Sequence, residues 1–148
     1  MKVSTKGRYG VLAMLALCIY QSKGPVAVRE VSSKLGISSG YLEQIFSSLR
    51  NAGILESIRG PHGGYLPSAT PSKISVGEVL RILEGPLSPV KCVDGDDGVC
   101  KREDECITRG VWEKMGDTIS STVDSITFGN LMKECPDLQI GTEHMYYI

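Results

Sequence analysis

Histidine, paired cysteines and long apolar runs are scarce or missing in this 148-residue sequence. The two histidines, His62 and His144, lie far along the chain from the cysteines between residues 91 and 106. An enzyme built on those cysteines would need a general acid or base beside them, so we expect no enzymatic activity; a metal-dependent redox enzyme is the alternative from another class. Structural zinc usually draws on Cys-x-x-Cys pairs, and the sequence has none. A zinc site made from spaced cysteines stays open.

The apolar run near the N-terminus, residues 11–20, is too short to span a bilayer, which takes about 20 apolar residues. Basic residues precede the run, as in a secretory signal, but residues 20–23 (YQSK) offer no small-residue cleavage site. The segment is instead predicted to be a fully buried helix with Thr5 as its N-cap, ended by Gly24-Pro25. We therefore expect a cytoplasmic protein with no membrane partner, whose thiols stay reduced.

The small net charge of -1 hides an asymmetry along the chain. Residues 1–66 carry eight Lys or Arg and three acidic residues, whereas residues 67–148 carry eight basic and fourteen acidic residues. A basic half in a nearly neutral protein favours a polyanionic partner for that half alone.

Two short amphipathic segments in the basic half flank a glycine. Val28, Val31 and Leu35 recur at helical spacing before Gly36, and a second set follows at positions 42, 45, 46 and 49. Ser38 or Ser39 can cap the second helix. This layout predicts a helix-turn-helix, with an ordinary helical hairpin as the alternative.

A predicted β-hairpin follows directly, with strands at residues 54–58 and 65–66. Its turn contains Gly60, Pro61 and two further glycines, which favours a wing beside the helix-turn-helix. Arg59, Gly60 and Pro61 at the tip are predicted to contact DNA, because a guanidinium can grip phosphate or enter a minor groove. His62 is interpreted as a solvated turn residue.

The second helix of the motif is predicted to read base edges with the outward side chains near its N-terminus. Gln44 can pair with adenine, and Glu43 can accept a hydrogen bond from the cytosine amino group. Because phosphates repel a carboxylate, the orientation of Glu43 could decide which DNA sites are bound. The predicted contact residues of this helix are Ser38, Gly40, Tyr41, Glu43 and Gln44.

Two more helices are predicted beyond a Pro- and Ser-rich connector at residues 67–75. The segment VGEVLRILEG is amphipathic, and residues 109–128 carry one apolar stripe at positions 112, 115, 119, 123 and 126. This long helix must pack on another surface. We expect a copy of itself in a twofold dimer that reads two half-sites of a palindrome, with the first helix of its own chain as the alternative partner.

Three cysteines stand among acidic residues in KCVDGDDGVCKREDEC. Cys92, Cys100 and Cys106 are separated by seven and five residues. The acidic neighbours should raise thiol pKa values, but a bound cation or cluster would reverse that effect. The loop is therefore interpreted as a ligand site that needs a fourth ligand for an iron-sulfur cluster. Cys18 is predicted to lie in the core, and Cys135 on the surface.

Several of these segments together resemble the IscR, NsrR and CymR family of bacterial winged-helix regulators. They are residues 1–10, ISSGYLEQIFSSLRNAGIL, RGPHGGYL, VGEVLRILEG and the three-cysteine loop. The resemblance is strongest to the IscR-like branch, and YLEQIF with RGPHGGYL is its most specific part. It covers roughly residues 1–132.

The resemblance implies a mainly α fold with a small β wing. Residues 1–75 would form a winged helix-turn-helix DNA-binding domain, residues 76–132 the cluster loop and a long dimerisation helix, and residues 133–148 a tail. It further implies a homodimeric transcription repressor or regulator that binds a palindromic promoter site in double-stranded DNA. A [2Fe-2S] cluster held by Cys92, Cys100 and Cys106 would select between promoters, including those of cluster-assembly genes.

The chain departs from this family pattern at the fourth ligand. IscR-like proteins commonly use a histidine three residues after the third cysteine, where this chain has Arg109, which offers no lone pair. Nitric-oxide-sensing relatives can use a carboxylate where this chain has Arg8. The candidates are a non-protein ligand, Glu43, or a loop carboxylate among Asp94, Asp96, Asp97, Glu103, Asp104 and Glu105.

Two other signals stay open within the same fold. The cluster could respond to nitric oxide or redox stress, or the chain could bind a partner enzyme of cysteine metabolism, as cluster-free relatives do. The three cysteines disfavour the second of these.

Overall fold

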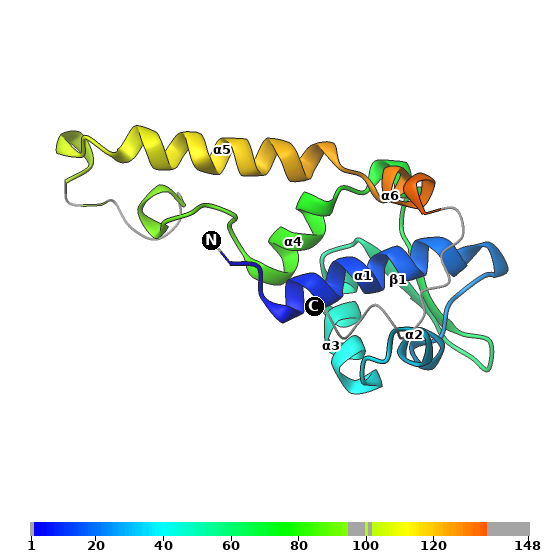
Figure 1. The fold of residues 1–148 in the computed structure, drawn as a ribbon. Helices are drawn as coiled ribbons and strands as arrows, with labels where there is room; N and C mark the ends of the chain where they lie inside the picture. Colours follow the sequence, from blue (N-terminus) through cyan, green and yellow to red (C-terminus); the bar gives the residue numbers. More distant parts are fainter. Residues whose placement is uncertain (1, 95–99, 101, 136–148) are drawn as a thin grey trace.

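The computed structural model describes residues 2–94, 100 and 102–135 (Figure 1). Within these residues it is mainly helical and has one two-stranded antiparallel sheet, as predicted. The helices, short 3-10 turns (η) and strands are α1 (Thr5–Tyr20), η1 (Gln21–Lys23), α2 (Val28–Leu35), α3 (Ser39–Asn51), β1 (Leu55–Ile58), β2 (Gly64–Pro67), η2 (Pro71–Lys73), α4 (Val76–Glu84), η3 (Lys91–Val93), η4 (Glu103–Glu105), α5 (Arg109–Ser125) and α6 (Phe128–Glu134).

Helix α1 is apolar on all sides, and the elements α2, α3, α4, α6 and β2 pack against it. Met14 and Leu17 are fully buried by this packing. The opposite side, with Leu12, Leu15 and Ile19, is only half-buried. The prediction of a helix is confirmed, but the prediction that it is fully buried is wrong, because the rest of the chain covers only one side of it.

The start of α1 is fixed by Ser4, which is the N-cap in place of the predicted Thr5. The Ser4 hydroxyl accepts a hydrogen bond from the Gly7 N–H at 3.1 Å. Glu84, the last residue of α4, accepts hydrogen bonds from the Ser4 N–H at 2.7 Å and from the Ser4 hydroxyl. Any side chain at Gly7 would clash with Glu84. These contacts tie the beginning of α1 to the end of α4.

One hydrophobic core joins α1, α2, α3, α4, β1 and the first residue of α6. Its largest fully buried side chains are Phe46 of α3 and Phe128 of α6. The Phe46 ring lies 5.1 Å from the Tyr65 ring of β2, which joins the core to the hairpin. Val79 and Leu83 of α4 belong to the same core. Packing is therefore continuous across residue 75, where the sequence analysis divided the chain.

The hairpin pairs Leu55 with Pro67 and Ile58 with Gly64 in an antiparallel register. Val26, just before α2, adds a third edge to it through backbone hydrogen bonds with Tyr65 at 3.0 and 2.9 Å. A side chain at Gly64 would clash with the Val26 backbone. The wing is thus attached to the segment that leads into the helix-turn-helix.

Helix α5 runs along one edge of the molecule, where α4 is the core helix that it contacts most (Figure 1). It ends at Ser125, three residues before the predicted end, and Phe128 instead begins α6. Thr127 caps α6, and its neighbours form a backbone bridge with the segment before α4: the Val76 N–H donates to the Ile126 carbonyl at 2.9 Å. The cap and the bridge require extended backbone, so the helical apolar stripe is interrupted there.

We expect Phe46→Ala to lower the free energy of unfolding by about 3–5 kcal/mol, because it leaves a cavity at the centre of the core. Urea denaturation followed by far-ultraviolet circular dichroism measures this change. Ile58→Ala is the control, since Ile58 is 47% exposed, and it should change stability by only about 0.5 kcal/mol. Equal losses in the two variants would contradict this view of the core.

Candidate functional site

The turn between α2 and α3 has the geometry of a helix-turn-helix. Gly36 ends α2 with φ of 65°, a left-handed conformation that favours glycine. The Ser32 hydroxyl donates to the Ile37 carbonyl at 2.6 Å, and the Ser38 hydroxyl caps α3 by accepting from the Tyr41 N–H at 3.3 Å. The predicted cap is confirmed. The Ser38 hydroxyl thus caps its own helix, although the residue remains exposed.

The outward face of α3 is polar and shallowly grooved. Gly40, Glu43 and Gln44 are exposed on it, as the helical periodicity predicts. The same groove continues along the helix to Ser47 and Asn51, which the sequence analysis missed. The spacing of four and eight residues from Glu43 could have identified them, because it keeps all three side chains on one face.

Tyr41 differs from the other predicted contact residues. It is half-buried, and its ring meets the Tyr9 ring of α1 edge-on, with 6.0 Å between the centroids. An edge-to-face pair of this kind adds to packing beyond the area that it buries. Tyr41 thus joins the reading helix to α1.

The wing tip presents Arg59, Gly60 and Pro61 as exposed residues, with His62 beside them also exposed. Gly60 has φ of 119°, which L side chains rarely adopt, and its carbonyl accepts a hydrogen bond from the Gly63 N–H at 3.0 Å. In Figure 1 the hairpin, α2 and α3 lie on the side of the molecule opposite α5. The elements that carry the predicted reading residues therefore lie on one side of the molecule.

We expect Arg59→Ala to weaken binding to every DNA duplex and to reduce the slope of log K against log salt by about one, because one phosphate contact is lost. Fluorescence anisotropy titrations at several salt concentrations give both quantities. Lys133→Ala, which removes an exposed cation from α6, is the matched control and should leave the slope unchanged. An unaltered slope in the Arg59 variant would argue against a phosphate contact at the wing.

The three cysteines lie in the loop between α4 and α5. Cys92 is exposed, Cys100 and Cys106 are half-buried, and all three are free thiols. Cys18 and Cys135 are buried and exposed, as predicted; burial raises the pKa of the Cys18 thiol to about 12. Within the described residues, no three Cys, His, Asp or Glu side chains lie close enough together to hold a metal ion.

Cys106 lies three residues before the first residue of α5, Arg109. The Thr108 hydroxyl is 3.5 Å from its sulfur. The pKa of the Cys106 thiol is lowered, first by the Thr108 side chain and then by backbone N–H groups and the charge of Arg109. The expectation that acidic neighbours raise the thiol pKa is therefore wrong for Cys106, because the start of a helix supplies donors that favour the thiolate.

Two positions discussed for the fourth ligand, Arg109 and Glu43, have other surroundings in the structure. The Arg109 guanidinium donates to Glu113 at 2.7 Å along α5. Glu43 belongs to α3, which lies on the opposite side of the molecule from α5 (Figure 1). Asp96, Asp97 and the Glu103 side chain lie outside the described part of the structure.

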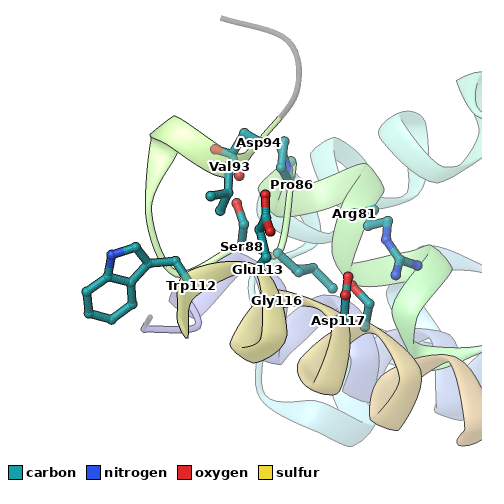
Figure 2. A pocket seen from close by; sticks show the side chains of 12 residues that line it. Arg81, Pro86, Ser88, Val93, Asp94, Trp112, Glu113, Gly116 and Asp117 are labelled. Atoms are coloured by element: carbon teal, nitrogen blue, oxygen red, sulfur yellow. The ribbon is translucent and has the colours of Figure 1, made fainter. Parts of the chain in front are cut away.

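Asp94 is the candidate carboxylate with a distinctive environment. Its Oδ1 atom is buried and accepts no hydrogen bond from the described residues. It lines a pocket of about 670 Å³ between α5 and the segment that follows α4, with Ser88 and Glu113 among its other lining residues. Figure 2 shows this pocket; the Trp112 indole extends away from the other labelled side chains. A buried carboxylate oxygen that accepts no hydrogen bond within the described residues has an electron pair available for a ligand.

The chain resembles known proteins in both its sequence and its structure. Residues 3–134 match the family model Rrf2, described as iron-dependent transcriptional regulator. The chain belongs to the Rrf2 family. It is thus a bacterial-type DNA-binding transcription regulator and not an enzyme, as predicted. No helix in the described part of this Rrf2 protein is long and apolar enough to cross a bilayer.

Relatives within the Rrf2 family cover nearly the whole chain. The HTH-type transcriptional regulator IscR of Vibrio atlanticus is 41% identical over 141 residues, 95% of this chain and 80% of the relative. That of Escherichia coli O1:K1 / APEC is 37% identical over 147 residues, 99% of this chain and 90% of the relative.

Two solved Rrf2 structures share the fold. IscR of T. potens has a TM-score of 0.74 and 38% identity, over 99% of this chain and 97% of that one. CymR, the global cysteine regulator of B. subtilis, has a TM-score of 0.73 and 38% identity, over 90% of this chain and 98% of that one. The predicted winged-helix family is confirmed.

Proposed function

We propose that this Rrf2 protein is a cytoplasmic homodimer that binds palindromic promoter sites and senses a [2Fe-2S] cluster held by Cys92, Cys100 and Cys106. Its targets would include genes for cluster assembly. The observation that carries the proposal is the set of three accessible free thiols in a family described as iron-dependent. They lie in the loop between α4 and α5, and α5 is the helix proposed for dimerisation.

The donor chemistry of the loop fits such a cluster. Cysteine binds iron as thiolate, and the pKa of Cys106 is already lowered by Thr108. The Oδ1 of Asp94 is buried, accepts no hydrogen bond from the described residues and stands two residues after Cys92 in sequence; we propose Asp94 as the fourth ligand in place of histidine. The bound cluster would supply a reversible electron acceptor, and its bonds to the three thiolates would hold the loop closed.

The dimer is proposed from the apolar surface of α5. Val111 is 52% exposed and Met115 43% exposed, and with Ile119 they border an apolar depression along the helix. Exposed side chains of this kind on one helix favour burial against a second copy. A twofold dimer would place two reading helices on two half-sites of a palindrome.

Within this proposal, residues 1–75 read DNA and residues 76–132 hold the cluster and the partner. Closing the loop around a ligand orders it, because the thiolates must converge. The ordered and the open loop would then favour different arrangements of the neighbouring helices, so cluster occupancy shifts the population between them.

We expect purified protein, isolated without oxygen, to show a structured visible absorption band with equal iron and acid-labile sulfide. Cys92→Ala should lose the band, because one thiolate ligand is removed. Cys135→Ala is the matched control and should keep it, since Cys135 is an exposed cysteine at the end of α6. A colourless protein after anaerobic reconstitution, or one that holds zinc, would contradict the cluster and leave the DNA-binding function intact.

We expect Glu43→Ala to reduce the difference in sequence preference between cluster-loaded and cluster-free protein. A carboxylate on the outward face of α3 tolerates only those sites where a cytosine amino group lies opposite, and alanine removes that requirement. Selection of duplexes from a random pool by each form, followed by sequencing, measures the preference.

Glu56→Ala, which removes an exposed carboxylate from β1, should leave that selection unchanged. If the Glu43 variant selected the same two sets of sites as the wild type, Glu43 would have no part in discrimination.

A further inference from the structure

The C-terminal end of α5 is attached at two places to α4 and the segment just before it. The first is the backbone bridge, in which the Val76 N–H donates to the Ile126 carbonyl and the Phe128 N–H donates to the Ile74 carbonyl, at 2.9 and 3.0 Å. The second is an ion pair between Arg81, five residues after Val76, and Asp124, two residues before Ile126. Arg81 Nη1 lies 2.6 Å from Asp124 Oδ1, and Arg81 Nη2 lies 2.9 Å from Asp124 Oδ2.

Two parallel hydrogen bonds between a planar guanidinium and a carboxylate fix direction as well as distance. Gly77 makes room for this pair. A side chain there would clash with Asp124 Oδ1 and would lie 3.0 Å from Arg81 Nη1. The glycine, the arginine and the aspartate therefore form one fitted joint between α4 and α5, which we call the α4–α5 joint.

The space beside the joint is open. The pocket of about 670 Å³ extends from Arg81 to Asp94 and separates the segment after α4 from α5 (Figure 2). Beside this pocket, a Cβ added at Gly116 of α5 would lie in ordinary van der Waals contact with Pro89 and Ser88, at 3.6 and 3.7 Å. The base of α5 is thus fixed in direction by hydrogen bonds, whereas beside its middle the described residues form van der Waals contacts and an open pocket.

The geometry of α5 makes the joint sensitive to the cysteine loop. Cys106 lies three residues before the start of this 17-residue helix, which is about 25 Å long at 1.5 Å per residue. A displacement of about 4 Å at the loop end corresponds to a tilt of roughly 10° at the base for a rod of that length. Helix α4, on the other side of the joint, packs against α1 and α3.

We propose that Arg81 and Asp124 are positioning residues that transmit the state of the cysteine loop through α5 and α4 to the reading helix α3. The inference rests on the proposed function, because it concerns how cluster occupancy changes DNA affinity. The two side chains are 37% and 46% exposed, so the pair adds little to global stability. Its contribution is to hold one angle between two helices.

The test measures the ratio of DNA dissociation constants for the cluster-free and cluster-loaded dimers. The probe is a duplex selected from a random pool by the wild-type loaded protein, and anisotropy gives each constant. In Asp124→Asn the amide keeps the size but loses the charge and the second acceptor oxygen. We expect its ratio to fall to within about twofold of one, from the 5- to 150-fold range usual for coupled sites. Its visible spectrum and melting temperature should stay those of the wild type.

Two further variants make the result specific. Arg81→Lys keeps the charge but loses the planar fork, and it should also lower the ratio. Asp117→Asn removes an exposed carboxylate seven residues earlier on the same face of α5 and should keep the wild-type ratio. The charge-swapped double variant, Arg81→Asp with Asp124→Arg, should recover at least half of the lost ratio.

The outcomes separate the joint from the proposed function. A wild-type ratio well above one that Asp124→Asn leaves unchanged would overturn the joint and keep the cluster sensor. An equal loss in Asp117→Asn would also overturn the joint, since charge on α5 in general would then be responsible. A wild-type ratio of one, with the cluster present by its spectrum, would overturn both.

Discussion

The structure depends on the burial of α1. A helix that is apolar on every side must be covered on every side, and the chain covers only the side that carries Met14 and Leu17. Helices α3, α4 and α6 and the strand β2 all take their places against that side. The contact of Glu84 with Ser4 then ties the end of α4 to the start of α1. The point at which the chain leaves the core toward the cysteine loop therefore depends on how α4 packs against α1.

Much of the fold was predictable because its signals are local. The spacing of Val31 and Leu35, the glycine at position 36 and the serine cap of α3 each act within a few residues. The hairpin was equally clear from its turn residues. The N-cap was placed one residue too late, at Thr5; the bonds that Ser4 also donates to Glu84, 80 residues away in sequence, are marked by no local pattern. The end of α5 was misplaced for the same reason, since the bridge to the segment before α4 interrupts the apolar stripe.

The sequence predicted which segments carry the candidate sites, but not the contacts of the individual side chains in them. Helical periodicity put Glu43 and Gln44 outward, but it could not show that Tyr41 turns toward Tyr9. Counting acidic residues predicted the wrong direction for the pKa of Cys106, because the nearest groups in space are Thr108 and backbone donors. The pair of Arg81 and Asp124 joins residues 43 positions apart, and no pattern in the sequence marks it.

The bridge between Val26 and Tyr65 has a consequence for how such a protein can change its behaviour. It connects the wing to the entry of the helix-turn-helix by paired backbone hydrogen bonds, and the Phe46 ring connects that same strand to α3. The reading helix and the wing of one subunit are therefore coupled to each other by direct contacts. In the proposed dimer, a signal that moves α3 would also carry the wing with it, and would so change the distance and twist between the two subunits' DNA contacts.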